Sequence, residues 1–468
     1  MNTADPFFPL LADLEGLTVF TALKEHILIR KLRKLLRGVL DEPEILSGEY
    51  VLEISASWAA FIREYSRSSR EASFYEKTVL LTAADDNEFT RTAELCGRDC
   101  SSNILYAAAR TDLQRLGRIA QADIPALGRR IAEMLGSAGL ADQKNAADET
   151  CAALAANLQT AREKHPAMYI FVPGRDWGAA LPAFAEYLRS NGAGILGAGG
   201  AFYWQKDKTG KSGLIPVLNP DPIRPADLSG YEDQRSMVVS NTLRFLEGKP
   251  AGNLLLYGDR GTGKSATVKA VCNEYTRRGL RLVEVRKRDL LELPAILDTL
   301  AVRALRFVLF IDDLSFEQTD DSFTTLKALL EGGIEAKPGN VVVYATSNRR
   351  HLVKERFSDR PSMAAAAEAH ATGDVRAFDT MQEQLSLADR FGVTVVFTAP
   401  DQDEYLRIAE FLAEHRGLLP EETGESGDER KRFRENALRW ERWFNGRSPR
   451  TAVQYVDWVA GGSDFPWE

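Results

Sequence analysis

The residues best suited to chemistry lie between Leu254 and Ala266, in the stretch LLLYGDRGTGKSA. The apolar run 254–257 predicts a strand, and the segment 266–275 predicts a helix. Between them stands G-x-x-x-x-G-K-S, the pattern of a phosphate-binding loop in its required strand–turn–helix context. A glycine-rich turn without a ligand is the alternative. The residues expected to bind a nucleoside triphosphate are Gly258, Asp259, Arg260, Gly261, Thr262, Gly263, Lys264, Ser265 and Ala266.

Each residue type in this loop has a physical reason. Glycines allow positive φ and let the backbone approach an anion closely. Successive N–H groups then point inward at the positive end of the following helix. Lys264 supplies a positive charge for the outer phosphates, and Ser265 supplies a hydroxyl ligand for Mg²⁺.

A pair of acids follows a second apolar run. Residues 307–311 predict a buried strand, and Asp312 and Asp313 come directly after it. In a parallel sheet this pair is expected beside the phosphate loop. We expect Asp312 to hold Mg²⁺, directly or through water, and Asp313 to orient or deprotonate the attacking water. The alternatives are an acidic pair that caps the next turn and Glu317 as a longer base.

Three further polar side chains complete the candidate site. Asn348 follows the apolar run 341–346 and would reach both the γ-phosphate and the water. Arg390 lies between a helix and a strand, where it would reach the nucleotide of a neighbouring subunit. Arg450 opens the last helix and would reach back to the phosphates. A polar turn residue and surface ion-pair partners are the corresponding structural alternatives.

Composition limits the class of protein. The chain of 468 residues is too long for one core, so two or three domains are expected. A net charge of −8 argues against a wholesale binder of nucleic acid or anionic membrane. The four cysteines predict reduced thiols in a cytoplasmic protein, with no metal cluster. The acidic start and the lack of a long apolar run predict neither a signal peptide nor a membrane span.

Periodicity predicts four regions. Residues 1–190 are expected to form a mainly helical domain, with one helix over 22–40 and a short strand over 168–172 as an exception. Residues 191–218 read as a glycine-rich connector or hairpin. Residues 219–400 alternate strands and helices, which predicts an αβα nucleotide-binding core with a parallel sheet. Residues 401–468 are expected to form a helical lid.

In this order and spacing, the motifs resemble those of the AAA+ ATPases, from about residue 220 to 460. The strings GYEDQ, LLLYGDRGTGKS, FIDDLSFE, YATSNRRHL and LSLADRFG are similar to an uncharacterised bacterial family of predicted AAA+ ATPases. The sequence around Asp312 resembles the branch of replication initiators and helicase loaders. The resemblance implies an α/β AAA+ P-loop core, a second-sensor role for Arg450 and an arginine-finger role for Arg390. Asp313 departs from the commoner Glu, which puts fast hydrolysis in doubt.

The resemblance implies ATP and Mg²⁺ as cofactors and assembly into a homo-oligomer through shared ATP sites. We therefore expect an ATPase that remodels or loads an unknown protein client. A non-enzymatic ATP-dependent switch or scaffold is one alternative. A DNA-associated loader is a less favoured one, motivated by the basic runs 286–288, 349–350 and 430–432.

Overall fold

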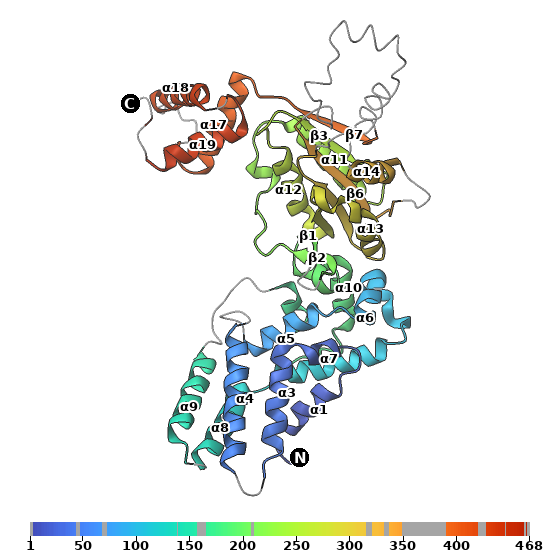
Figure 1. The fold of residues 1–468 in the computed structure, drawn as a ribbon, viewed down its shortest axis with the longest axis vertical. Coiled ribbons are helices and arrows are strands. Elements are labelled where there is room, and N and C mark those ends of the chain that lie inside the picture. The colour runs from blue at the N-terminus through green and yellow to red at the C-terminus, as the bar shows by residue number, and fades with distance from the viewer. Residues whose placement is uncertain are drawn as a thin grey trace. The chain divides into compact units, whose positions relative to one another are not determined.

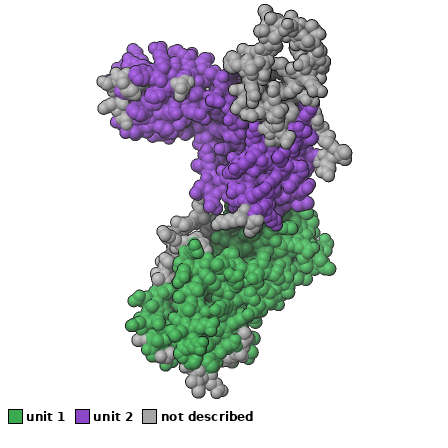
Figure 2. Space-filling model, in the orientation of Figure 1, with its two compact units in different colours: residues 1–198 green, residues 199–468 purple. Residues whose placement is uncertain are grey.

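The computed structural model describes residues 3–43, 47–67, 73–137, 139–156, 165–206, 210–314, 321–331, 337–348, 390–419, 427–444, 446–462 and 465. The chain divides into two compact units, unit 1 over 1–198 and unit 2 over 199–468 (Figure 2). Glu317, Arg349 and Arg350, all considered above, lie outside the described residues. No helix in the described ranges has the length and apolar character needed to cross a membrane.

The regular elements in the described residues of unit 1 are all helices (Figure 1). Its helices are α1 (Phe8–Glu15), α2 (Ala22–Glu25), α3 (Ile27–Leu40), α4 (Gly48–Arg67), α5 (Phe74–Ala83), α6 (Glu88–Cys96), α7 (Tyr106–Ala120), α8 (Ile124–Ser137), α9 (Ala141–Ala156) and α10 (Leu181–Asn191), with 3-10 turns η1 (Gly97–Ser102), η3 (Pro166–Tyr169) and η4 (Gly194–Ala198). The single helix expected over 22–40 is wrong, because the extended backbone of His26 (ψ 132°) separates α2 from α3.

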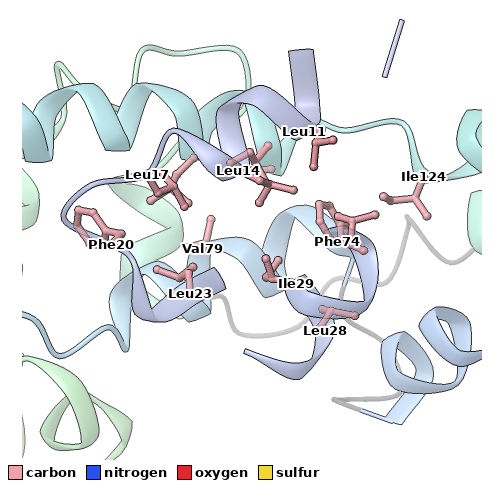
Figure 3. Close-up of a cluster of buried hydrophobic side chains, with 14 of the residues drawn as sticks. Leu11, Leu14, Leu17, Phe20, Leu23, Leu28, Ile29, Phe74, Val79 and Ile124 are labelled. Carbon is pink, nitrogen blue, oxygen red and sulfur yellow. The ribbon is translucent and has the colours of Figure 1, made fainter. Parts of the chain in front are cut away.

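The core of unit 1 forms where apolar helix faces meet. Leu14, Phe20 and Ile29 lie in one buried cluster (Figure 3). Asp112 is also fully buried, and its carboxylate accepts hydrogen bonds from three successive backbone N–H groups, those of residues 18–20. These bonds fix the turn after α1 against α7.

The strand expected over 168–172 is wrong. Pro166 begins the 3-10 turn η3, and the His165 ring accepts a hydrogen bond from the N–H of Ala167. Phe171 is buried and packs against the rings of Trp177 and Phe184. The apolar run therefore supplies core side chains to a helical unit, where no sheet recruits it in the described residues.

Unit 2 is built on a seven-stranded sheet with the order β2-β1-β4-β5-β6-β3-β7. Among the described strands, the β1–β2 hairpin pair is antiparallel and the other pairings are parallel. The strands are β1 (Ala201–Lys206), β2 (Ser212–Pro216), β3 (Leu254–Gly258), β4 (Leu280–Glu284), β5 (Arg306–Ile311), β6 (Val341–Ser347) and β7 (Val393–Phe397). The hairpin of β1 and β2 therefore extends the sheet beyond β4.

Both faces of the central strands are buried, as a parallel sheet requires. Leu256 and Val308 share an apolar cluster with helices α11 (Glu232–Leu246) and α12 (Lys264–Tyr275). Their neighbours Leu255 and Leu309 point to the opposite face and are also fully buried. Helix α13 (Leu293–Ala301) contacts β6, and α14 (Asp321–Glu331) follows β5 in the chain.

The C-terminal part of unit 2 is a three-helix lid of α17 (Gln402–His415), α18 (Gly427–Trp443) and α19 (Pro449–Ala460) (Figure 1). Buried rings of Tyr405, Trp440 and Tyr455 form its centre. An α/β core with a parallel sheet, a helical lid and a mainly helical N-terminal part is confirmed.

Candidate nucleotide-binding site

The phosphate loop joins β3, between β6 and β7, to the N-terminus of α12. Gly258 has φ 138°, and a Cβ placed there would lie 1.9 Å from the carbonyl oxygen of Phe397. The loop therefore passes so close to β7 that only glycine fits. Gly263 caps α12 with φ 89°, and nothing in the described residues lies within 4 Å of its ideal Cβ. The first N–H groups of α12 thus face an open cradle that suits an anion.

The lid meets the loop at Gly261. The N–H of Arg450 donates to the carbonyl oxygen of Gly261 at 3.2 Å. A Cβ on Gly261 would lie 3.0 Å from Ser448 Oγ, so this glycine also allows a close approach. Ser448 caps α19 by accepting a hydrogen bond from the N–H of Thr451. The start of α19 is thereby fixed beside the loop, which places Arg450 at the site.

Lys264 is only 6% exposed, and its ammonium group donates to the carbonyls of Gly258 (3.0 Å) and Asp259 (2.6 Å). Burial lowers the pKa of Lys264, whereas the carboxylates of Asp259, Asp312 and Asp313 act in the opposite direction. The positive charge of Arg450 adds to the lowering of this pKa. Lys264 therefore lies within electrostatic reach of all the candidate acids.

One loop residue expected to bind nucleotide, Asp259, has other partners in the structure. The Asp259 carboxylate accepts a hydrogen bond from the N–H of Ala399 at 2.7 Å, and its own N–H donates to Phe397. Asp259 thus fastens the loop to the end of β7. The Arg260 side chain is exposed, and Ala266 lies in the first turn of α12.

The structure brings the predicted metal ligands together. Ser265 Oγ donates to Asp312 Oδ1 at 2.6 Å. Ser265 follows β3 and Asp312 follows β5, and β6 lies between these two strands in the sheet. A hydroxyl and a carboxylate beside an open, glycine-lined cradle fit a Mg²⁺ ion, which prefers oxygen ligands and keeps several waters. The donor set thus suits the metal that accompanies a nucleotide.

The second acid and the sensor also meet. Asn348 Nδ2 donates to Asp313 Oδ1 at 2.7 Å. Asp313 has φ 50°, a conformation that is strained for most residues with a side chain. Sequence reasoning missed Thr346, whose hydroxyl donates to Asp312 Oδ1 at 2.5 Å and accepts from the N–H of Asp313 at 2.9 Å. The signal was a polar residue near the end of the apolar run VVVYA.

Arg390 is not brought to the phosphate loop of its own chain. It precedes β7, which runs parallel to β3 with Val393 opposite Leu254 and Phe397 opposite Gly258. Arg390 therefore lies at the amino edge of the sheet, and the four residue steps from Val393 to Phe397 alone span about 13 Å at ~3.3 Å per residue. The backbone of Arg390 thus lies at the sheet edge opposite to the one that carries its own phosphate loop.

One arginine in each of the two described basic runs that motivated DNA binding has a structural partner. Arg430 lies within ion-pair distance of Glu410 and Glu414 in the lid. The Arg286 guanidinium lies 5.4 Å from the centre of the Tyr203 ring. These contacts favour a structural role for both arginines.

Solved structures with some similarity include two of Thermotoga maritima RuvB and one of DnaI. The first, a RuvB variant, is 17% identical with a TM-score of 0.33, and the match covers 52% of this chain and 66% of that chain, just under two thirds of its length. The second, described as a Holliday junction branch migration motor, is 15% identical with a TM-score of 0.29 and coverages of 51% and 73%. DnaI is 21% identical with a TM-score of 0.26 and coverages of 38% and 89%.

No match was found among the curated proteins. A family model described as "Protein of unknown function (DUF815)" matches residues 198–463, more than half of the chain and nearly all of unit 2. This range includes the phosphate loop, both acids, Asn348 and the lid. The expected membership of a family of unknown function is thus confirmed over this range, and the chain belongs to the DUF815 family.

Proposed function

We propose that this protein is a Mg²⁺-dependent ATPase of the AAA+ type that remodels or loads a protein partner. The observation that carries the proposal is the continuous hydrogen-bonded network from Ser265 through Asp312 and Thr346 to Asp313 and Asn348. It unites, at one edge of the sheet, a hydroxyl and an acid for the metal with a second acid for the water.

Each residue has a role in this proposal. Lys264 exchanges the carbonyls of its own loop for the outer phosphate oxygens. Ser265 and Asp312 would hold Mg²⁺, which would neutralise charge on the phosphates when bound. Asp313 orients the attacking water and accepts its proton. Asn348 donates hydrogen bonds to the γ-phosphate and the water, and Arg450 supplies positive charge from the lid.

We further propose that the site is shared between subunits of a homo-oligomer. Arg390 lies at the far edge of the sheet from its own loop, so its guanidinium would neutralise charge at a neighbour's γ-phosphate. The turnover rate per subunit is then expected to rise with protein concentration.

Phosphate release from ATP, measured with and without Mg²⁺, tests the assignment. The wild-type protein is expected to turn over ATP only with Mg²⁺. Lys264→Ala is expected to lose nucleotide binding, and Asp313→Asn to keep binding and lose turnover. Absence of turnover by the wild type across a wide range of protein concentrations would sink the enzymatic proposal. If the wild type does turn over ATP, capture of partners by the Asp313→Asn protein with bound ATP would identify the client.

A non-enzymatic switch is the second candidate, favoured by the contact between Gly261 and Arg450 N–H. Nucleotide in the loop would change how the lid docks, and the short side chain of Asp313 would make hydrolysis slow. A single-turnover measurement separates the candidates. Fast phosphate release from preloaded protein eliminates the switch, whereas ATP that stays bound and intact supports it.

A further inference from the structure

Thr346 lies between the two acids of the candidate site. Its side chain is 2% exposed, on β6, which runs between β5 and the loop strand β3. Its hydroxyl donates to Asp312 Oδ1 at 2.5 Å and accepts from the N–H of Asp313 at 2.9 Å. One buried hydroxyl therefore touches both the expected metal ligand and the backbone of the expected base.

The directions of these two hydrogen bonds are fixed by chemistry. A backbone N–H can only donate, so the Thr346 oxygen accepts from Asp313 and its proton turns to the carboxylate of Asp312. Ser265 Oγ and the N–H of Asp313 also donate to Asp312 Oδ1, at 2.6 and 3.2 Å. Three donors on one oxygen fix the orientation of this carboxylate and leave Oδ2 for the metal or its water.

The same hydroxyl holds the unusual backbone of Asp313. A φ of 50° costs free energy for a residue with a side chain, so it needs contacts that enforce it. The hydrogen bond from Asp313 N–H to Thr346 is one such contact, and it accompanies the bond between the Asp313 side chain and Asn348.

We propose that Thr346 is a positioning residue that couples the metal-holding acid Asp312 to the water-activating acid Asp313. This inference rests on the proposed function, because it concerns the same site. Loss of the hydroxyl would release Asp312 and relax Asp313 together. The affinity for Mg²⁺ and the turnover rate would therefore fall together.

The test compares Thr346→Val, which keeps the β-branched shape, with Thr346→Ser, which keeps the hydroxyl. Binding of a fluorescent ATP analogue is titrated with Mg²⁺, and ATP turnover is measured in parallel. Thr346→Val is expected to raise the Mg²⁺ concentration for half-maximal binding about tenfold and to lower kcat at least about tenfold. Its Mg²⁺-independent binding is expected to stay unchanged. Thr346→Ser is expected to restore both quantities to within about threefold of the wild type.

A Thr346→Val protein with wild-type Mg²⁺ dependence and kcat overturns the inference. So does a Thr346→Ser protein as impaired as Thr346→Val, because that result assigns the effect to packing. The same result is expected for Thr346→Ala as for Thr346→Val. If only one of these two variant proteins folds, that protein decides the question. If the wild type itself neither binds nor hydrolyses Mg²⁺–ATP, the proposed function fails, which is a distinguishable outcome.

Discussion

Asn348 and Asp313 extend from adjacent parallel strands and meet at 2.7 Å, with the amide of Asn348 donating to the carboxylate of Asp313. The amide thus fixes one oxygen of the proposed base and leaves the other available to a water. Because Asp has one methylene fewer than Glu, this orientation matters more here than it would for a longer acid.

Replacement of Asn348 tests that relationship. Asn348→Ala is expected to lower kcat about a hundredfold, because a donor aimed at the reacting groups is lost, and to change ATP binding by less than about threefold. Steady-state phosphate release and nucleotide titration measure the two effects. Asn273→Ala is the control, since the Asn273 amide donates to backbone carbonyls near the far end of α12. Equal losses in both variants contradict the prediction.

Two of the three glycines in the phosphate loop distinguish the effect of a steric clash from the effect of backbone strain. Both Gly258 and Gly263 have positive φ, but only at Gly258 would a methyl collide with backbone in the described structure. Gly258→Ala is expected to destabilise unit 2 by about 3 kcal/mol or more, and Gly263→Ala by about 1–2 kcal/mol from strain alone. Thermal unfolding without nucleotide measures both. Equal stability of the two variants would show that the loop does not pass β7 this closely.

Much of this site could be predicted from sequence, because the chemistry-bearing residues end apolar runs. Parallel strands that end at one edge must bring Ser265, Asp312 and Asn348 together. The role of Thr346 could not be predicted, since a single hydroxyl in a strand has no pattern of its own. The positive φ of Asp313 was equally invisible, because it depends on contacts from another strand. The break between α2 and α3 at His26 could not be predicted either, because the apolar residues on both sides of it keep helical spacing.

A buried acid in unit 1 predicts a pH dependence of stability. Burial raises the pKa of Asp85 to about 6 from its ordinary value of 3.8. The folded state then binds this proton more tightly than the unfolded state. The stabilisation is therefore complete below about pH 3.8 and is lost as the pH rises through about 6. Asp85→Asn is expected to increase the free energy of unfolding at pH 7, by up to about 3 kcal/mol, and to change it little near pH 4.

Denaturant unfolding followed across pH 4 to 7 checks this expectation. The side-chain carbonyl that Asp85→Asn introduces can still accept the hydrogen bond that Asn87 gives to Asp85 at 2.8 Å, so packing is retained. If Asp85→Asn keeps the wild-type slope between pH 4 and 6, the pH dependence has another source.

The location of Arg390 predicts complementation between two inactive variants. Arg390→Ala keeps its own phosphate loop, and Lys264→Ala keeps its own Arg390. If the site is shared, a mixture contains interfaces that combine the intact loop of one with the intact Arg390 of the other. ATP turnover of the mixture is then expected to exceed the sum of the separate activities. The double variant Lys264→Ala/Arg390→Ala is the control, because it has neither an intact phosphate loop nor an intact Arg390. β7 holds Arg390 at the opposite edge of the sheet from its own loop. If the mixture is as inactive as that control, Arg390 does not act at the loop of a neighbouring subunit either, and the site is not shared.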